Sequence, residues 1–217
     1  KKDHDITLTL REKKNPIPLY AKDYTGVLPE IGPSFGFDFK VGDWVQPHGK
    51  GERTDIIFKA AEIQDENGNW GGRLEITFEN KKEGILFIDE DYLKSSEMVM
   101  PHIAPEEGYE EAYTRVEYGY QNENKEKNGS FFIRTRKKIL PDGAEQYTYT
   151  KFFTGLEFLM GGGKFVEEKY REISPKEMAR IEFTYAFNPT PDDRNLEFDP
   201  QQNLMKNLDY QERVTQP

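Results

Sequence analysis

The 217-residue sequence contains no cysteine and only three histidines. The missing cysteine excludes a disulfide framework and any thiolate chemistry. His4, His48 and His102 are far apart and fit neither the HxH nor the HExxH spacing of zinc sites. The acidic run Asp89-Glu90-Asp91 is more typical of a solvated strand end than of a calcium loop. We therefore expect no bound metal and no cofactor.

Long apolar runs are also missing, and basic residues are outnumbered. The longest apolar run, Ile85 to Ile88, is far too short to span a membrane. The chain has 30 basic and 40 acidic residues, which gives a net charge of −10. Because an acidic surface repels phosphate backbones, this charge disfavours generic nucleic-acid binding. We expect neither a membrane span nor a nucleic-acid partner.

Aromatic residues, in contrast, are abundant: the chain has 15 Phe, 12 Tyr and 2 Trp. So many large apolar side chains argue against disorder, because their burial can stabilise a folded core. There is no internal repeat and no clear linker. We therefore expect one β domain over residues 1–187, followed by an extended tail over residues 188–217.

Period-two alternation of apolar and polar residues dominates the chain and predicts strands. The predicted strands lie near residues 6–10, 35–39, 54–64, 73–79, 111–121, 131–140, 147–153 and 165–173. Turn chemistry separates several of them: Asn67-Gly68 favours a tight hairpin, and so does Pro141-Asp142-Gly143. Strands joined by short turns predict an all-β fold, an antiparallel β-sandwich or jelly roll; a closed lipocalin-like barrel is the alternative.

One short helix is expected near the end of this domain. Ser174-Pro175-Lys176-Glu177 has a capping serine, a proline at the first helical position and a glutamate three residues after the cap. Met178, Ile181 and Tyr185 would then share a helix face. The alternation of Phe183, Tyr185 and Phe187 suits a strand instead, so we expect a short helix followed by a final strand that ends before Asn188.

The loop between the second and third predicted strands, Asp43 to Asp55, is the stretch that most resembles a site. Trp44 is a potential platform for a sugar ring, and His48 lies between proline and glycine, which suits an exposed loop tip. The alternative interpretation is structural, with Trp44 closing one end of the core, because tryptophan is usually largely buried. Gly49-Lys50-Gly51 lacks the spacing of a phosphate-binding loop.

An enzymatic function would require reactive groups on the polar face of the sheet. The sequence has no GxSxG elbow. Glu111 and Glu117 fall on one face of a predicted strand, but six residues separate them by about 20 Å, too far for a glycosidase pair. Tyr113, Arg115, Arg134 and Arg136 could instead serve a polysaccharide lyase, although cross-strand ion pairs of the two later arginines with the glutamates are the commoner arrangement.

We therefore expect a non-catalytic β-sandwich that binds a glycan or a protein partner, with a polysaccharide lyase or glycoside hydrolase as the alternative. The candidate contacts are Trp44, His48, Trp70, Tyr113 and Arg115. The sequence begins with Lys1-Lys2-Asp3-His4 and no methionine, which favours a processed leader, so we expect a secreted or periplasmic protein.

The tail over residues 188–217 has three prolines and many polar residues, a composition typical of disorder. It also carries apolar side chains that could anchor it: Leu196, Phe198, Leu204, Met205 and Leu208. The last three have the spacing of a short helical face. We expect the tail to dock through these residues on its own domain or on a neighbouring subunit, which would make a homo-oligomer possible.

Overall fold

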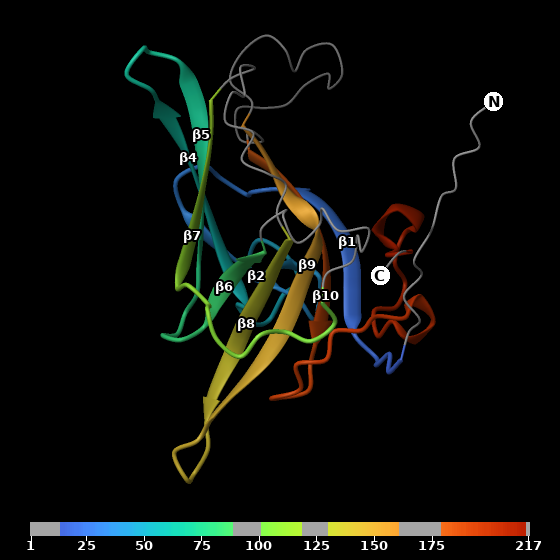
Figure 1. Cartoon of the computed structure of the whole chain (residues 1–217). Coiled ribbons are helices and arrows are strands. Elements are labelled where there is room, and N and C mark those ends of the chain that lie inside the picture. Colours follow the sequence, from blue (N-terminus) through green and yellow to red (C-terminus); the bar gives the residue numbers. More distant parts are fainter. Residues whose placement is uncertain (1–13, 89–100, 119–129, 161–178, 216–217) are drawn as a thin grey trace, which may run out of the picture.

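The structure is a computed structural model and describes residues 14–88, 101–118, 130–160 and 179–215. Their strands form two five-stranded antiparallel sheets (Figure 1). The first sheet has the order β1 (Tyr20–Val27), β10 (Ala179–Asn188), β9 (Glu145–Met160), β8 (Ser130–Ile139) and β6 (Gly84–Ile88). The second sheet has the order β3 (Asp43–Trp44), β2 (Ser34–Asp38), β4 (Ile56–Gln64), β5 (Trp70–Thr77) and β7 (Ala112–Tyr118). The expected β-sandwich is confirmed, and the two sheets do not close into a barrel in the described part of the chain.

Aromatic side chains fill the space between the two sheets. Phe37 and Phe58 project from the second sheet, and Phe152 and Phe183 project from the first; all four are buried. The Phe183 ring lies 4.7 Å from the ring of Phe152 and 5.8 Å from that of Phe58, stacked on both. Each residue belongs to a strand with period-two alternation, so its backbone position places it inside. The aromatic residues noted in the sequence are therefore the core that joins the two sheets.

The β4–β5 hairpin forms as the Asn-Gly step predicts, and it extends beyond the other strands of its sheet (top left in Figure 1). Gly68 adopts a φ of 82°, a conformation that glycine reaches without strain. The Asp65 carboxylate accepts hydrogen bonds from the backbone N–H groups of Asn67 and Asn69, at 2.9 and 2.8 Å. Gln64 then pairs with Trp70, and the ladder continues from there to Ile57 and Thr77.

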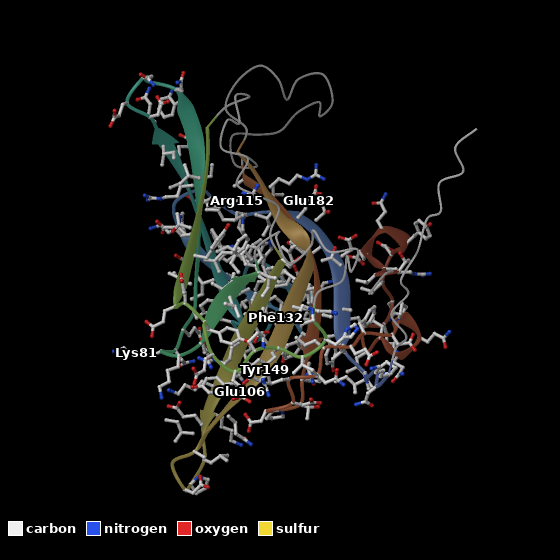
Figure 2. The ribbon with its side chains drawn as sticks, viewed as in Figure 1. Lys81, Glu106, Arg115, Phe132, Tyr149 and Glu182 are labelled. Carbon is white, nitrogen blue, oxygen red and sulfur yellow. The ribbon has the colours of Figure 1, made fainter. Side chains whose placement is uncertain are left out.

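A further layer covers the outer face of the first sheet. Leu196 and Phe198, from the tail, are fully buried there. Leu196 packs in a cluster with Phe132 and Tyr149, which Figure 2 labels, and Phe198 packs with Ala186 and other residues of β1 and β10. Because these two anchors lie on the domain's own sheet, the tail is docked within the chain.

The tail also closes one edge of the first sheet. Leu204 donates its backbone N–H to the carbonyl of Leu19, at 2.8 Å. The side chain of Asn203 accepts from the N–H of Ala21 at 3.1 Å and donates to its carbonyl at 2.8 Å. Exposed edge strands recruit other chains, so this cover protects β1 from intermolecular pairing. Residues 204–208 form no helix. The prediction that Leu204, Met205 and Leu208 share a helical face is therefore wrong.

Helices are few in the described residues. Two short 3-10 turns occur, η2 (Pro200–Gln202) and η3 (Tyr210–Glu212), and no helix of the described chain is long and apolar enough to cross a membrane. The helix predicted from Ser174, the strands predicted near residues 6–10 and 165–173, and the run 89–91 lie outside the described residues. Ile181 and Tyr185 share a face of strand β10, not of a helix, because the period-two pattern continues through Phe187.

Candidate functional site

The loop from Asp43 to Asp55 is organised by carboxylates that accept backbone hydrogen bonds. Asp43 accepts from the N–H of Trp44 at 2.8 Å and from that of Lys50 at 2.9 Å. Gly49 lies so close to the neighbouring chain that an added Cβ would clash with the carbonyl oxygen of Trp44. Asp43, Gly49 and Lys50 therefore shape a tight turn of the backbone.

Two other carboxylates hold the ends of this loop and are joined to the first sheet by Arg136. Asp38 accepts from the N–H groups of Glu52 and Arg53, at 3.0 and 3.1 Å. Asp55 accepts from the N–H of Phe39 at 2.8 Å, and from Nε and Nη2 of Arg136 at 2.6 and 2.8 Å. Nη2 of Arg136 also lies 3.2 Å from Asp38. Asp38, Asp55 and Arg136, which we call the buried ion cluster, link the two sheets.

In the buried ion cluster, the charge of Arg136 and the charges of the two aspartates offset each other's cost of burial. Burial raises the pKa of Asp55, while the hydrogen bonds and charge of Arg136 act in the opposite direction. Burial also disfavours the charge of Arg136, but the two aspartates outweigh that effect and raise its pKa. With bidentate geometry and such short distances, we assign the cluster as ionised. Sequence reasoning missed it, because its members lie on three separate segments.

Trp44 and His48, two of the five predicted contacts, lie beside the core at the β3 edge. Trp44 is 5% exposed, and its ring packs edge-on against Phe37 and Phe58 at 5.5 and 5.8 Å. No broad ring face is therefore open to a sugar at Trp44. His48 is exposed, and its ring stands 4.8 Å from that of Phe35.

Tyr113 and Arg115 lie on the inner face of β7, opposite to the expectation that they line a polar face. Tyr113 is the register partner of Ile76, and Arg115 that of Leu74; both partners are fully buried. Arg115 is itself buried, whereas Ala112 and Thr114, on the opposite face of the strand, are exposed. The alternation of the strand is correct, but alternation alone cannot tell which side faces the core.

Trp70 is exposed, as His48 is, and 63% of its surface is accessible, whereas Trp44 and Arg115 are buried. It lies at the start of β5, opposite Gln64, on the same face of the hairpin as Leu74 and Arg115. Leu74 is at the core, so Trp70 extends the inner face of the sheet beyond the part that the first sheet covers. An exposed indole on a paired hairpin is an accessible element for binding a ligand or partner.

The five candidates do not form one site. Trp44 and His48 lie at the β3 edge, and β2 and β4 separate them from Trp70 on β5 and from Tyr113 and Arg115 on β7. At about 4.8 Å per strand, the two groups are roughly 14 to 19 Å apart across the sheet. A small ligand cannot touch both groups at once.

Arg134 and Arg136, expected to share a face, point to opposite sides of β8. A bulge between Thr135 and Lys138 shifts the register, and Arg136 has a φ of 55°, so the strand rotates between the two arginines. Arg136 turns inward to the buried ion cluster. Arg134 lies between the rings of Tyr109 and Tyr147, at 4.6 and 4.7 Å.

The hydrogen bonds of Arg134 explain what it does in the fold. Its Nε donates to the carbonyl of Lys82 at 2.9 Å, and its Nη1 donates to the carbonyl of Glu106 at 3.0 Å. The expected ion pair with Glu111 is replaced by these backbone contacts, which fasten segment 101–110 to the first sheet. Arg136 is thus directed inward, and Arg134 is held between two tyrosine rings.

No group of three or more His, Asp or Glu side chains in the described chain is arranged to hold a metal ion. The buried carboxylates of Asp38 and Asp55 accept hydrogen bonds from Arg136 and from backbone N–H groups. Lys151 is a further buried charge that the sequence did not indicate; burial lowers its pKa to about 8. Comparisons of the chain with models of protein families, with curated proteins and with solved structures find no match.

Proposed function

We propose that this protein is a non-catalytic, extracytoplasmic β-sandwich that binds a glycan or a protein partner through the tip of the β4–β5 hairpin. The observation that carries the proposal is the 63% exposure of Trp70. The hairpin that carries it is regular, with β4 and β5 paired from Gln64 and Trp70 to Ile57 and Thr77. Tryptophan is usually buried, and where it is exposed on a rigid element it is a frequent anchor of binding interfaces.

The remaining charged candidates support binding over catalysis. Asp38, Asp55 and Arg136 hold a loop and join the sheets, and Arg134 fastens segment 101–110. A substrate could bind these four side chains only by displacing the contacts that hold the loop, the two sheets and segment 101–110 together. Release of reducing sugars, or of unsaturated uronates, by the purified protein from a panel of polysaccharides would overturn this part of the proposal.

Replacing Trp70 with alanine tests the assignment. We expect a loss of at least about tenfold in affinity for any glycan identified on an array or for any purified partner, because truncation of a hot-spot tryptophan typically costs about 2 kcal/mol or more. The matched control is Tyr210→Ala, which removes another exposed aromatic ring, 85% accessible, on the C-terminal segment. Affinity is measured by calorimetry, and equal affinities for the Trp70→Ala variant and the native protein would contradict the assignment.

Export from the cytoplasm is a separate part of the proposal. It is tested by expressing the full-length gene product in its native host and assaying cell fractions with an antibody. Recovery of the protein from the cytoplasmic fraction alone would overturn it, without affecting the role of Trp70.

A further inference from the structure

We infer that the ligand of the β4–β5 hairpin is an uncharged glycan, and that the hairpin discriminates against acidic glycans. This inference rests on the proposed function and names the ligand class. Between Glu62 and Gly72 the hairpin carries three acidic residues, Glu62, Asp65 and Glu66, and no lysine, arginine or histidine. Trp70 is therefore surrounded on its own hairpin by negative charge.

The nearest basic residues of the two strands do not offset this charge. Lys59 and Arg73 lie on the opposite, outward face of the sheet, because Trp70 shares its face with Leu74. Both are also within 4 Å of Glu75, Lys59 at 3.9 Å and Arg73 at 3.1 Å. Arg115 shares the face of Trp70 but is 8% exposed, beneath the hairpin tip. A uronate or sulfate placed on the indole would therefore meet like charges first.

The same side chains suit the hydroxyl groups of a neutral sugar. Carboxylates accept hydrogen bonds from hydroxyl groups, and side-chain amides both accept from them and donate to them. The indole face packs against the C–H groups of a pyranose ring. The side chains of Glu62, Glu66 and Asn67 are exposed around the tip. The turn is held in place by Asp65, whose pKa is lowered chiefly by the side-chain hydrogen bond from Asn69, and by Gln64, which donates to the carbonyl of Gly68 at 2.8 Å. A rigid tip loses little entropy on binding.

Matched polymers test the inference. Neutral derivatives (hydroxyethyl cellulose, dextran and a galactomannan) are compared with carboxymethyl derivatives of the same backbones in affinity electrophoresis. We expect at least one neutral polymer to retard the protein, and its carboxymethyl form to bind at least about tenfold more weakly at low salt. Binding of the neutral polymer should not change between 20 mM and 500 mM NaCl, whereas binding driven by charge would.

The two tryptophans provide an internal probe. Trp44 is 5% exposed and Trp70 is 63% exposed, so a ligand that protects tryptophan fluorescence from iodide or acrylamide reports on Trp70. The Glu62→Gln/Glu66→Gln variant keeps the indole and removes two charges. We expect this variant to narrow the difference between neutral and carboxymethyl polymers at least threefold, because the difference comes from like-charge repulsion.

The outcomes separate the inference from the proposed function. Tighter binding of the carboxymethyl polymers, or an unchanged difference in the Glu62→Gln/Glu66→Gln variant, would overturn the neutral-glycan inference while leaving Trp70 as the anchor. The neutral-glycan inference would also be overturned, and Trp70 kept as the anchor, if no polymer bound and a purified protein partner bound in a Trp70-dependent manner. Retardation that persists in the Trp70→Ala variant would overturn both.

Discussion

Lys151 carries a charge at a place where charge is costly. The side chain is fully buried on the face of the first sheet that the tail covers. Burial lowers the pKa of Lys151 to about 8, although the nearby charge of Glu197 acts in the opposite direction. An unfolded lysine titrates near 10.4. Below about pH 8 both states hold the proton and the folded state bears the full cost; as the pH rises towards 10.4 the cost disappears.

Replacing Lys151 with methionine, which has a similar length and no charge, should therefore stabilise the protein at neutral pH. We expect a gain of up to roughly 3 kcal/mol in the free energy of unfolding at pH 7, which corresponds to the difference between the two pKa values. The gain should vanish near pH 10.5. Urea unfolding at the two pH values measures it, with the exposed Lys138→Met substitution as control. An equal effect at both pH values would show that the charge of Lys151 does not cause it.

At the scale of the elements, the bulge in β8 is what brings Arg136 to the buried ion cluster. A regular strand would place Arg134 and Arg136 on one face; the shift between Thr135 and Lys138 places them on two. The inward arginine then meets two buried aspartates from the second sheet. Removing one partner of such a cluster leaves buried charge without compensation, which typically costs about 3 to 5 kcal/mol.

We expect Arg136→Met to lose at least about 3 kcal/mol in the free energy of unfolding at pH 7, because Asp38 and Asp55 then face each other without a counter-charge. Asp55→Asn in the same background should recover part of this loss, since it removes one of the two stranded charges. A double-mutant cycle measured by denaturant unfolding gives the coupling. Additive effects of the two substitutions would contradict a direct electrostatic link.

Local patterns predicted which segments are strands, but not how they meet. The alternation at Phe35, Phe37 and Phe39 and the Asn67-Gly68 turn gave the correct strands, because each depends on neighbouring residues only. The orientation of Tyr113 and Arg115 and the partners of Arg136 depend on another sheet, and no local pattern reports that. The sequence does not distinguish Trp44 from Trp70. Packing against Phe37 and Phe58 buries Trp44, whereas Trp70 is exposed.

At the scale of the whole molecule, the sandwich has a third, irregular layer made by the tail and by segment 101–110. Leu196 and Phe198 anchor the tail on the first sheet with no exposed area. Ala104 lies in the same cluster as Leu196, and Leu196 donates its N–H to the carbonyl of His102 at 2.6 Å. Within the described residues, the outer face of the second sheet carries no comparable layer.

The tail should accordingly be part of the folded unit. We expect the Leu196→Ala/Phe198→Ala variant to lose at least about 4 kcal/mol in the free energy of unfolding, since each truncation leaves a cavity under the layer. The control is Leu208→Ala, where the side chain is only half-buried. Calorimetry and light scattering give the melting temperature and the mass in solution. An unchanged melting temperature would show that the docked tail contributes nothing to stability.

The place of β10 in the first sheet determines when the protein can fold during its synthesis. β10 lies between β1 and β9, and Tyr20 near one end of the chain pairs with Phe187 near the other. While the ribosome is still translating, β1 has no neighbour with which to form its ladder, and Phe183 and Phe187 have not yet entered the core. Until β10 emerges, Phe37 and Phe58 of the second sheet lack their contacts with the ring of Phe183. Completion of the sandwich is therefore a late, long-range event, of the kind that is slow and that chaperones assist.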